Sequence, residues 1–301
     1  MYNYSIIIPH KNLPKLLQRC LDSIPERDDV ETIVVDDNSD PSVVNFEKFP
    51  GLQRKNVQVV FDKTGLGAGH ARNVGLLKAS GKWLVFADCD DFFEKDLLDS
   101  QMDAFKDDVC DLVLFKINYK DSESLVIANF EHKANSIFDL AKKENDQGYI
   151  RYRRNAPWAK FIRRELVETN NVRFDETRWS NDAWFSTRIA LLAQNVEYID
   201  SRIYNYTYRN DSLIKASSVE ALRCRLDVAL KCEGLLIDDG CAQYRAKHVE
   251  YWFYLLLKKS LWKGICNCSR VVKTIGLKGF VRGFLSNLKN DMLKKKILES
   301  E

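Results

Sequence analysis

The sequence has no long run of apolar residues, and it is poor in glycine and proline. Its longest uninterrupted apolar segment is Tyr251–Leu257, seven residues, whereas a membrane-spanning helix needs about 20. The first residues, MYNYSIIIPHKN, lack the basic and long apolar stretches of a signal peptide. With 13 glycines and 6 prolines in 301 residues, collagen-like and low-complexity classes are excluded. We expect a globular chain that neither crosses a bilayer nor carries an export signal.

The sequence also lacks paired cysteines and a large net charge. Its eight cysteines are scattered, and no two of them form a CxxC pair, the usual arm of a structural zinc site. We interpret them as free thiols of a reducing, cytoplasmic compartment. The net charge of +3 is too small to indicate a nucleic-acid partner, and we expect none.

Short apolar segments alternate with helical patterns over the first two thirds of the chain. Helices are expected after Asn12, as a capping residue, and over residues 69–79. Strands are expected at residues 4–9, 31–35, 57–61, 83–87 and 112–119. This alternation is typical of an α/β fold with a mostly parallel sheet flanked by helices. Ligands of such sheets bind beyond the carboxyl ends of the strands.

The last third of the chain differs in pattern and in charge. Residues 220–236 and 243–262 have helical periodicity, and residues 250–301 hold eleven basic and four acidic residues, a net charge of +7. We therefore predict a catalytic or binding domain at residues 1–212 and a helical region, basic and aromatic, at residues 213–301.

Acidic residues follow two of the predicted strands. Asp88-Cys89-Asp90-Asp91 comes directly after a buried strand, and carboxylates in that number suit Mg²⁺ or Mn²⁺ beside substrate phosphates. The alternative is that Asp90 or Asp91 only caps a helix beginning near Phe92. Asp36-Asp37-Asn38-Ser39 has the alternative of an Asx-rich turn. Glycines 65, 67 and 69 do not have the dinucleotide-binding spacing, and no Walker A motif is present.

Taken in order, these segments resemble the family 2 glycosyltransferases with the GT-A fold, over about residues 4–210. The matching segments are SIIIPHKN (5–12), VVDDNSD (34–40), AGHARNVGL (68–76), FADCDDFF (86–93), NAPWAKFIRREL (155–166), WSNDAWF (179–185) and YTYRNDS (206–212). The resemblance implies a Rossmann-like, mostly parallel sheet flanked by helices, with a C-terminal helical extension. Within the family, the sequence resembles transferases that build bacterial surface polysaccharides.

The resemblance also implies roles for single residues. Asp90 matches the metal-binding position of the DxD motif, and Asp182 matches the catalytic base of inverting members. The residues that match donor-nucleotide contacts are Pro9, Asp37, Arg72 and Asp88. Two positions depart from the family: Asn181 replaces the usual Glu, and His10 replaces Thr, Val or Ser.

Three tryptophans are candidate acceptor contacts, because aromatic rings stack on sugars. They are Trp158, Trp179 and Trp184. For the two that flank Asp182, Trp179 and Trp184, the alternative is packing in the core.

These residues together predict an inverting, metal-dependent glycosyltransferase. A divalent cation, Mn²⁺ or Mg²⁺, neutralises charge on the leaving diphosphate, and a carboxylate deprotonates the acceptor hydroxyl. We expect a nucleotide-sugar donor, most simply UDP-linked, and as acceptor a growing surface glycan linked to a polyprenyl diphosphate. The rivals are a catalytically silent glycan- or nucleotide-binding module and a metal-dependent nucleotidyltransferase.

The basic and aromatic C-terminal region suits an anionic membrane surface. We therefore expect a cytoplasmic protein attached peripherally to the inner face of the cell membrane. The alternative is a helical cap that packs its aromatic residues inward and leaves a solvated basic face.

Overall fold

The computed structural model describes residues 2–127, 133–208 and 217–298. The chain divides into two compact units, Met1–Ser212 and Leu213–Glu301. Arg209–Ser212, the end of the YTYRNDS segment, lie outside the described residues, as does the predicted boundary at residue 212.

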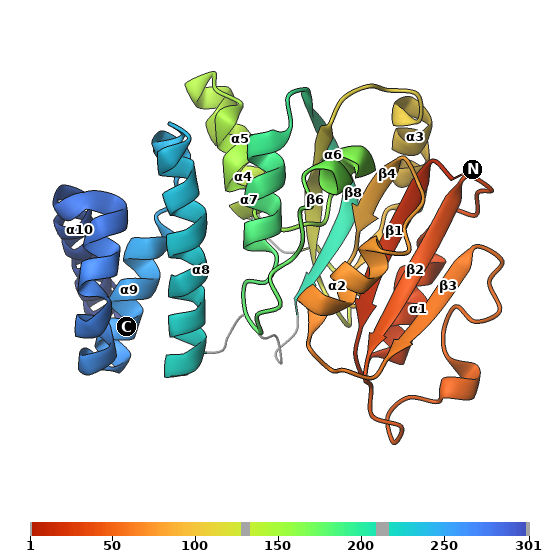
Figure 1. Cartoon of the computed structure of the whole chain (residues 1–301), viewed down its shortest axis with the longest axis horizontal. Helices are drawn as coiled ribbons and strands as arrows, with labels where there is room; N and C mark the ends of the chain where they lie inside the picture. The colour runs from red at the N-terminus through yellow and green to blue at the C-terminus, as the bar shows by residue number, and fades with distance from the viewer. Residues whose placement is uncertain (1, 128–132, 209–216, 299–301) are drawn as a thin grey trace. The chain divides into compact units, whose positions relative to one another are not determined.

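The first unit is built on one eight-stranded sheet (Figure 1). The strand order is β3-β2-β1-β4-β7-β6-β8-β5. The strands are β1 (Tyr4–His10), β2 (Val30–Asp37), β3 (Val57–Asp62), β4 (Trp83–Phe86), β5 (Phe92–Phe93), β6 (Leu112–Asp121), β7 (Lys160–Arg163) and β8 (Val196–Tyr208). The parallel pairs are β1–β2, β1–β4, β2–β3 and β6–β8. The strands β7 and β5 are antiparallel to their neighbours. The predicted mostly parallel α/β sheet is confirmed.

Apolar side chains cover both faces of this sheet and attach the helices to it. On one face, α1 (Pro14–Asp22) and α3 (Lys95–Phe105) contribute Leu17, Leu21, Leu98 and Met102 to the core. On the other face lie α2 (Ala68–Leu76), α4 (Lys133–Glu144), α5 (Gly148–Arg153), α6 (Arg164–Thr169) and α7 (Ala183–Leu192). A short 3₁₀ helix, η1, spans Phe46–Lys48. Strands buried on both faces explain the nearly unbroken apolar runs in the sequence.

The register of the parallel strands gathers polar residues at one edge of the sheet. His10 lies beside Asp36, and Asp37 lies beside Asp62. β4 runs parallel to β1, so the segment after β4, which carries Asp88, emerges at the same edge. This is the edge at which ligands of open α/β sheets bind.

Two local predictions are wrong. Asn12 does not cap α1: its backbone is left-handed (φ 57°), and its Oδ1 accepts a hydrogen bond from Asp40 N, which ties two loops together. No helix begins near Phe92 either. Phe92–Phe93 pairs with β8 as β5, because the edge of β8 offers it hydrogen-bond partners, and α3 starts only at Lys95.

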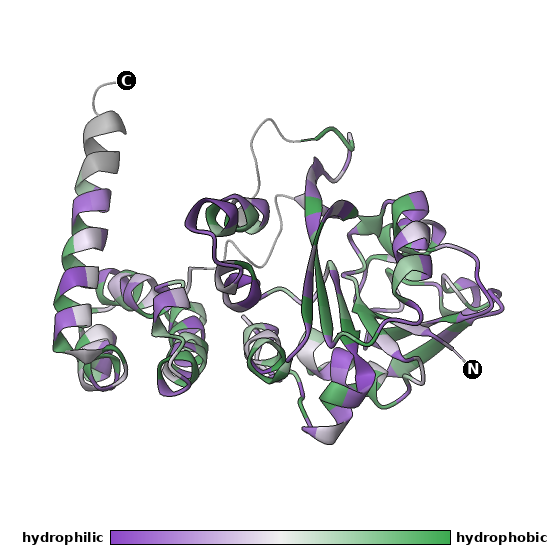
Figure 2. Ribbon diagram, turned by 90° about the horizontal axis from the view of Figure 1, so that it is seen from above, coloured by the Kyte–Doolittle hydropathy of each residue, from purple (hydrophilic) through white to green (hydrophobic). Residues whose placement is uncertain are grey.

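The second unit consists of helices: α8 (Val219–Asp238), the 3₁₀ helix η3 (Ala242–Tyr244), α9 (His248–Lys259) and α10 (Leu261–Leu298). The predicted helix at 243–262 is therefore divided among three elements. Gly276 (φ 73°) kinks α10. Phe253, Leu256 and Val271 lie in the core of this unit, and polar and apolar residues alternate along α10 (Figure 2). Within the described part of the chain, no helix combines the length and the apolarity that crossing a bilayer requires.

Candidate active site

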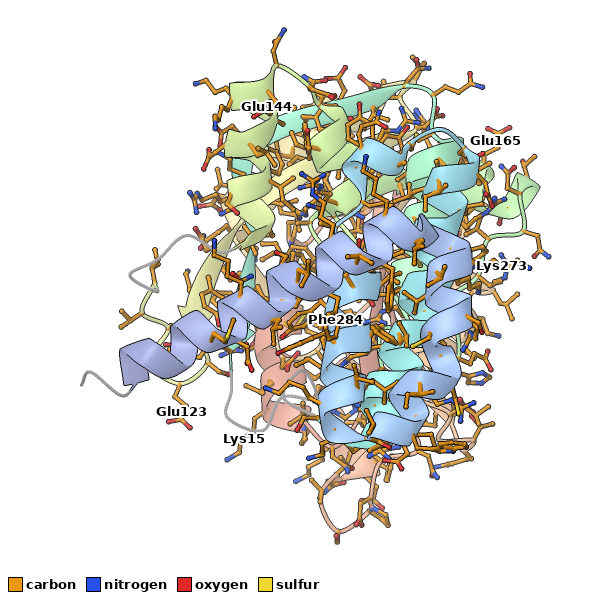
Figure 3. All side chains as sticks on the ribbon, turned by 90° about the vertical axis from the view of Figure 1, so that its left-hand side faces the viewer. Lys15, Glu123, Glu144, Glu165, Lys273 and Phe284 are labelled. Atoms are coloured by element: carbon orange, nitrogen blue, oxygen red, sulfur yellow. The ribbon has the colours of Figure 1, made fainter. Side chains whose placement is uncertain are left out.

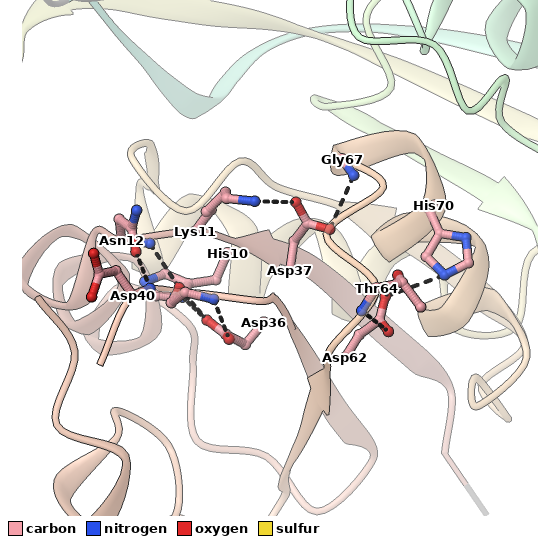
Figure 4. A network of polar contacts seen from close by, with 11 residues as sticks. His10, Lys11, Asn12, Asp36, Asp37, Asp40, Asp62, Thr64, Gly67 and His70 are labelled. Atoms are coloured by element: carbon pink, nitrogen blue, oxygen red, sulfur yellow. Dashed lines mark hydrogen bonds and ion pairs between the residues drawn. The ribbon is translucent and has the colours of Figure 1, made fainter. Parts of the chain in front are cut away.

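A buried hydrogen-bond network holds the loops after β1 and β2 together (Figure 4). Asp36 accepts hydrogen bonds from His10 Nδ1 (2.8 Å), Ser39 N (3.0 Å) and Ser39 Oγ (2.5 Å). His10 Nε2 accepts the Leu13 N–H at 3.0 Å, so this geometry requires a neutral imidazole with its proton on Nδ1. His10 and Asp36 therefore shape the edge of the site rather than line it.

Asp37 is the carboxylate of this pair that faces the glycine-containing loop. Its Oδ1 accepts the Gly67 N–H at 3.0 Å, and its Oδ2 lies 3.1 Å from Lys11 Nζ. Gly67 has φ 97°, a conformation that favours glycine. Pro9 is buried one strand away, beside Val35 of β2. The structure thus places Pro9 and Asp37 at the same edge of the sheet.

Asp88, Asp90 and Asp91 each offer a carboxylate oxygen, and these oxygens lie within 4.8 Å of one another. Asp91 is 1% exposed and already has partners: it accepts hydrogen bonds from Tyr204 Oη (2.8 Å) and Thr207 N (2.7 Å). Burial, with the charges of Asp90 and Asp88, raises the pKa of Asp91 well above its ordinary value. Asp91 therefore anchors the loop, and Asp88 and Asp90 are the carboxylates suited to a cation.

Tyr204 was not singled out by the sequence, yet it organises this loop. Its hydroxyl donates to Asp91 and accepts the Asp88 N–H at 2.9 Å. β8 thereby fixes both ends of the acidic segment. Only the position of Tyr204 two residues before the YTYRNDS segment could have suggested it.

Arg72 connects the acidic loop to a segment more than one hundred residues away. Its Nη2 pairs with Asp88 Oδ1, and its Nη1 donates to Asn181 Oδ1 at 2.8 Å. The guanidinium is buried above the ring of Phe174, 5.4 Å from the ring centroid. The guanidinium of Arg72, which α2 carries, is therefore held by Asp88, Asn181 and Phe174 and is not solvated.

Asp182 follows Asn181 and occupies the N-cap position of α7, where its side chain makes no capping hydrogen bond. Burial raises the pKa of its carboxyl above the ordinary value, and the charge of Arg72 partly opposes this shift. A carboxylate with a raised pKa is a stronger base than a solvated one. The network thus links the acidic loop, Arg72 and the segment that carries Asp182.

Close packing fixes that segment against α2. A Cβ atom at Gly69 would collide with the carbonyl oxygen of Asp175, so only glycine fits there. His70 adds two contacts, Nε2 to Asp62 (3.2 Å) and Nδ1 to Glu176 (3.0 Å). The third glycine of the G-x-G-x-G run therefore has a packing role.

The three tryptophans lie in different environments. Trp158 is 7% exposed, and its ring stacks on Tyr204 with centroids 5.5 Å apart, which leaves little of it for a ligand. Trp179 and Trp184 are half-buried and flank Asp182 in sequence. The structure therefore favours a packing role for Trp158, while Trp179 and Trp184 remain candidate acceptor contacts.

The known proteins to which this chain is similar are glycosyltransferases. The family model described as "Glycosyl transferase family 2" matches residues 5–170. Glycosyltransferase GlyA of Streptococcus pneumoniae is 24% identical over 78% of this chain, which spans 35% of GlyA. The crystal structure of Staphylococcus aureus TarS 1–349 with UDP-GlcNAc aligns over 94% of this chain and 81% of its own, with TM-score 0.64 and 21% identity.

A second solved structure is similar over nearly the same span. The mannosyltransferase PcManGT from Pyrobaculum calidifontis, in complex with GDP-Man and Mn²⁺, aligns over 95% of this chain and 87% of its own, with TM-score 0.59 and 16% identity. Likeness at this level establishes the shared fold, which is the GT-A fold expected from the sequence.

Proposed function

Because this chain belongs to glycosyl transferase family 2, we propose that it moves a sugar from a nucleotide-sugar donor to a hydroxyl of a growing surface glycan. One observation carries the proposal: Arg72 joins Asp88 of the acidic loop to Asn181, the neighbour of Asp182. Leaving-group stabilisation and proton removal require different groups on the two sides of one reacting carbon. Arg72 connects both groups of residues in a single network.

The donor is a nucleoside diphosphate sugar, most simply UDP-linked. Pro9, Asp37, Arg72 and Asp88 would contact its nucleoside and diphosphate from the carboxyl edge of β1, β2 and β4. The UDP-GlcNAc in the TarS structure and the GDP-Man in the PcManGT structure support the donor class. Hydrogen bonds from these few side chains would set the preference for one base over another.

The residues present fit a divalent cation, Mn²⁺ or Mg²⁺. Asp88 and Asp90 supply the hard oxygen ligands that these ions prefer, and Asp91 is committed to Tyr204 and Thr207. When bound, the cation would neutralise negative charge on the departing diphosphate. The Arg72 guanidinium keeps the Asp88 carboxylate oriented for that task.

Asp182 is the proposed base, and the reaction inverts the anomeric centre. Its raised pKa suits removal of a proton from the acceptor hydroxyl. A carboxylate on the face opposite the leaving group directs in-line attack, which changes the configuration. In this proposal, Trp179 and Trp184 would contact the acceptor sugar.

The acceptor is proposed to be linked to a polyprenyl diphosphate, with the enzyme held at the inner face of the cell membrane. At the start of α10, Trp262 is 71% exposed beside exposed Leu261 and Ile265, and Lys258, Lys259 and Lys263 lie close in sequence. Figure 3 shows α10 lying across α9 with Phe284 between them, where Phe284 contacts Tyr254 at 5.8 Å between ring centroids. Some aromatic residues thus pack inward, as a cap requires, while others face solvent and suit an anionic lipid surface.

Nucleoside diphosphate release tests this function against its rivals. We expect release from a nucleotide sugar only when divalent metal and glycan acceptor are both present. Binding of the sugar nucleotide without any release would indicate a silent binding module. Release of pyrophosphate from a nucleoside triphosphate would indicate a nucleotidyltransferase.

A further inference from the structure

Two basic side chains lie deep inside the first unit, outside the network described above. Arg154 follows α5 and is 3% exposed, and Lys160 begins β7 and is 2% exposed. Lys160 Nζ donates to the backbone carbonyl oxygen of Arg154 at 2.6 Å. The two cations therefore form one buried cluster, contributed by a single seven-residue stretch of chain.

The guanidinium of Arg154 is satisfied on one edge only. Its Nη1 donates to the carbonyl oxygens of Phe115 (3.0 Å) and Ala134 (3.4 Å). Its Nε and Nη2 are buried and have no hydrogen-bond partner. The Nε–Nη2 edge is the fork with which arginine binds an oxyanion through two parallel hydrogen bonds. The rings of Trp158 and Phe138 lie 5.6 and 5.7 Å from the guanidinium carbon and hold it in place.

Among residues 2–127, 133–208 and 217–298, neither side chain forms an ion pair, and the carboxylate that acts on Lys160 electrostatically is Asp182. Burial lowers the pKa of Arg154 to about 10. Burial and the charge of Arg154 lower the pKa of Lys160 to about 7, while Asp182 opposes that shift. An unpaired buried cation is costly, and an unsatisfied buried donor calls for an explanation. A bound anion supplies one.

We propose that Arg154 and Lys160 form a binding site for one phosphate group, held by the Nε–Nη2 fork of Arg154 and by the ammonium of Lys160. Two cations match a phosphate of charge near −2, and a tetrahedral oxyanion can accept hydrogen bonds from two directions. The assignment of that phosphate to the acceptor rests on the proposed function. Its support is a chain of contacts: the Trp158 ring, 5.6 Å from the guanidinium carbon of Arg154, stacks on Tyr204, whose hydroxyl accepts the Asp88 N–H.

Calorimetry and thermal unfolding of the full chain with inorganic phosphate test the site without any transfer reaction. We expect phosphate to bind and to raise the unfolding temperature. Arg154→Met should weaken phosphate binding at least tenfold, whereas Lys142→Gln, which removes an exposed charge from α4, should leave it unchanged. Equal phosphate binding by wild type and Arg154→Met, or no binding by wild type, would overturn the proposal.

A second measurement needs no variant and guards against misfolding of Arg154→Met. Sulfate has the shape of phosphate and stays a dianion near neutral pH. Any proton taken up when sulfate binds is therefore taken up by the protein and not by the ligand. Because a bound dianion raises the pKa of Lys160, sulfate binding above neutral pH should consume protons, seen as a buffer-dependent heat. Sulfate binding with no proton uptake would remove Lys160 from the site.

The source of the phosphate is decided by comparing ligands. A sugar 1-phosphate that binds more tightly than inorganic phosphate, and does so through Arg154, assigns the site to a phosphorylated acceptor. Equal affinity for the sugar 1-phosphate and for inorganic phosphate assigns the site to free phosphate. That result overturns the assignment to the acceptor and leaves the phosphate site itself in place. Since all these measurements omit donor and metal, a failure of the glycosyltransferase assignment would leave the phosphate site standing.

Discussion

Arg72 and Asn181 are joined by a hydrogen bond of 2.8 Å, although 109 residues separate them. The side-chain amide of Asn181 is neutral, whereas members of the family usually have a glutamate carboxylate at this position. Within the part of the chain that the structure describes, Arg72 therefore forms its ion pair with Asp88. The charge of Arg72 also acts on the neighbouring Asp182, where it lowers the pKa against the larger effect of burial.

Loss of Arg72 or Asp37 should weaken donor binding. Each substitution, Arg72→Ala or Asp37→Ala, removes a charged hydrogen-bonding group, worth about 1.5–3 kcal/mol, or roughly 10- to 100-fold in affinity. Calorimetry with UDP measures the effect, with Lys142→Gln as the surface control. Unchanged affinity in both variants would return Asp37 to a turn role and Arg72 to a purely structural one.

Asp90→Ala should abolish most of the transfer activity while the fold stays intact, because it deletes a proposed metal ligand. Chelation of divalent ions should do the same to wild type, and added Mn²⁺ or Mg²⁺ should restore it. Circular dichroism checks the fold. Near-normal turnover of the variant, or indifference to a chelator, would show that the metal assignment is wrong.

Tyr204→Phe should loosen the acidic loop without touching the donor directly. It removes a hydrogen bond to the buried Asp91 and leaves the Asp88 N–H without its acceptor, so we expect a loss of about 1–3 kcal/mol in the free energy of unfolding. Metal affinity should fall as well. Urea unfolding measures the first effect, with Tyr198→Phe as control. Stability equal to wild type would mean that the loop is held by other contacts.

Binding to anionic vesicles should depend on the start of α10. Trp262→Ala combined with Lys263→Gln should reduce sedimentation with phosphatidylglycerol vesicles, and high salt should release wild type, since each basic residue near such a surface contributes about 1 kcal/mol. Leu77→Ala, which removes an equally exposed apolar side chain (73%) from the first unit, is the matched control. Equal recovery in the supernatant with and without lipid would leave this region as a structural cap.

Sequence patterns located the strands β1, β2, β3, β4 and β6 because their apolar runs are short and bounded by polar residues. β5 has two residues and exists only through its pairing with β8, so no local pattern announces it. Asn12 is a good capping residue by type, but a tertiary contact with Asp40 determines its conformation. Local preference was overridden by long-range hydrogen bonds in both cases.

In the candidate site, too, some features were visible in the local sequence and others depend on long-range contacts. The acidic segments were visible as strand ends, and their juxtaposition follows from parallel pairing. The contact of Arg72 with Asn181 and the contact of Asp91 with Thr207 each join residues more than one hundred positions apart. The other partner of Arg72, Asp88, is near it in sequence. The burial of Arg154 and Lys160 was equally invisible, because a charged residue in a sequence is expected at the surface.

The pH profile of the reaction should reflect the raised pKa of Asp182. The base works deprotonated, so kcat/KM should fall as the pH falls through this raised pKa, at a higher pH than an ordinary aspartate would give. The acidic limb should be absent from UDP binding. If the acidic limb of the kcat/KM profile instead lay at the pKa of an ordinary aspartate, burial would not raise the pKa of Asp182.

The central claim is that Asp182 removes the proton from the acceptor hydroxyl. The most direct test compares wild type with Asp182→Asn for transfer and for donor binding, and determines the anomeric configuration of the product by NMR. We predict inverted product from wild type, unchanged donor affinity in the variant, and transfer reduced by at least ~10²-fold. Product with retained configuration, or near-normal transfer by Asp182→Asn, would contradict the account.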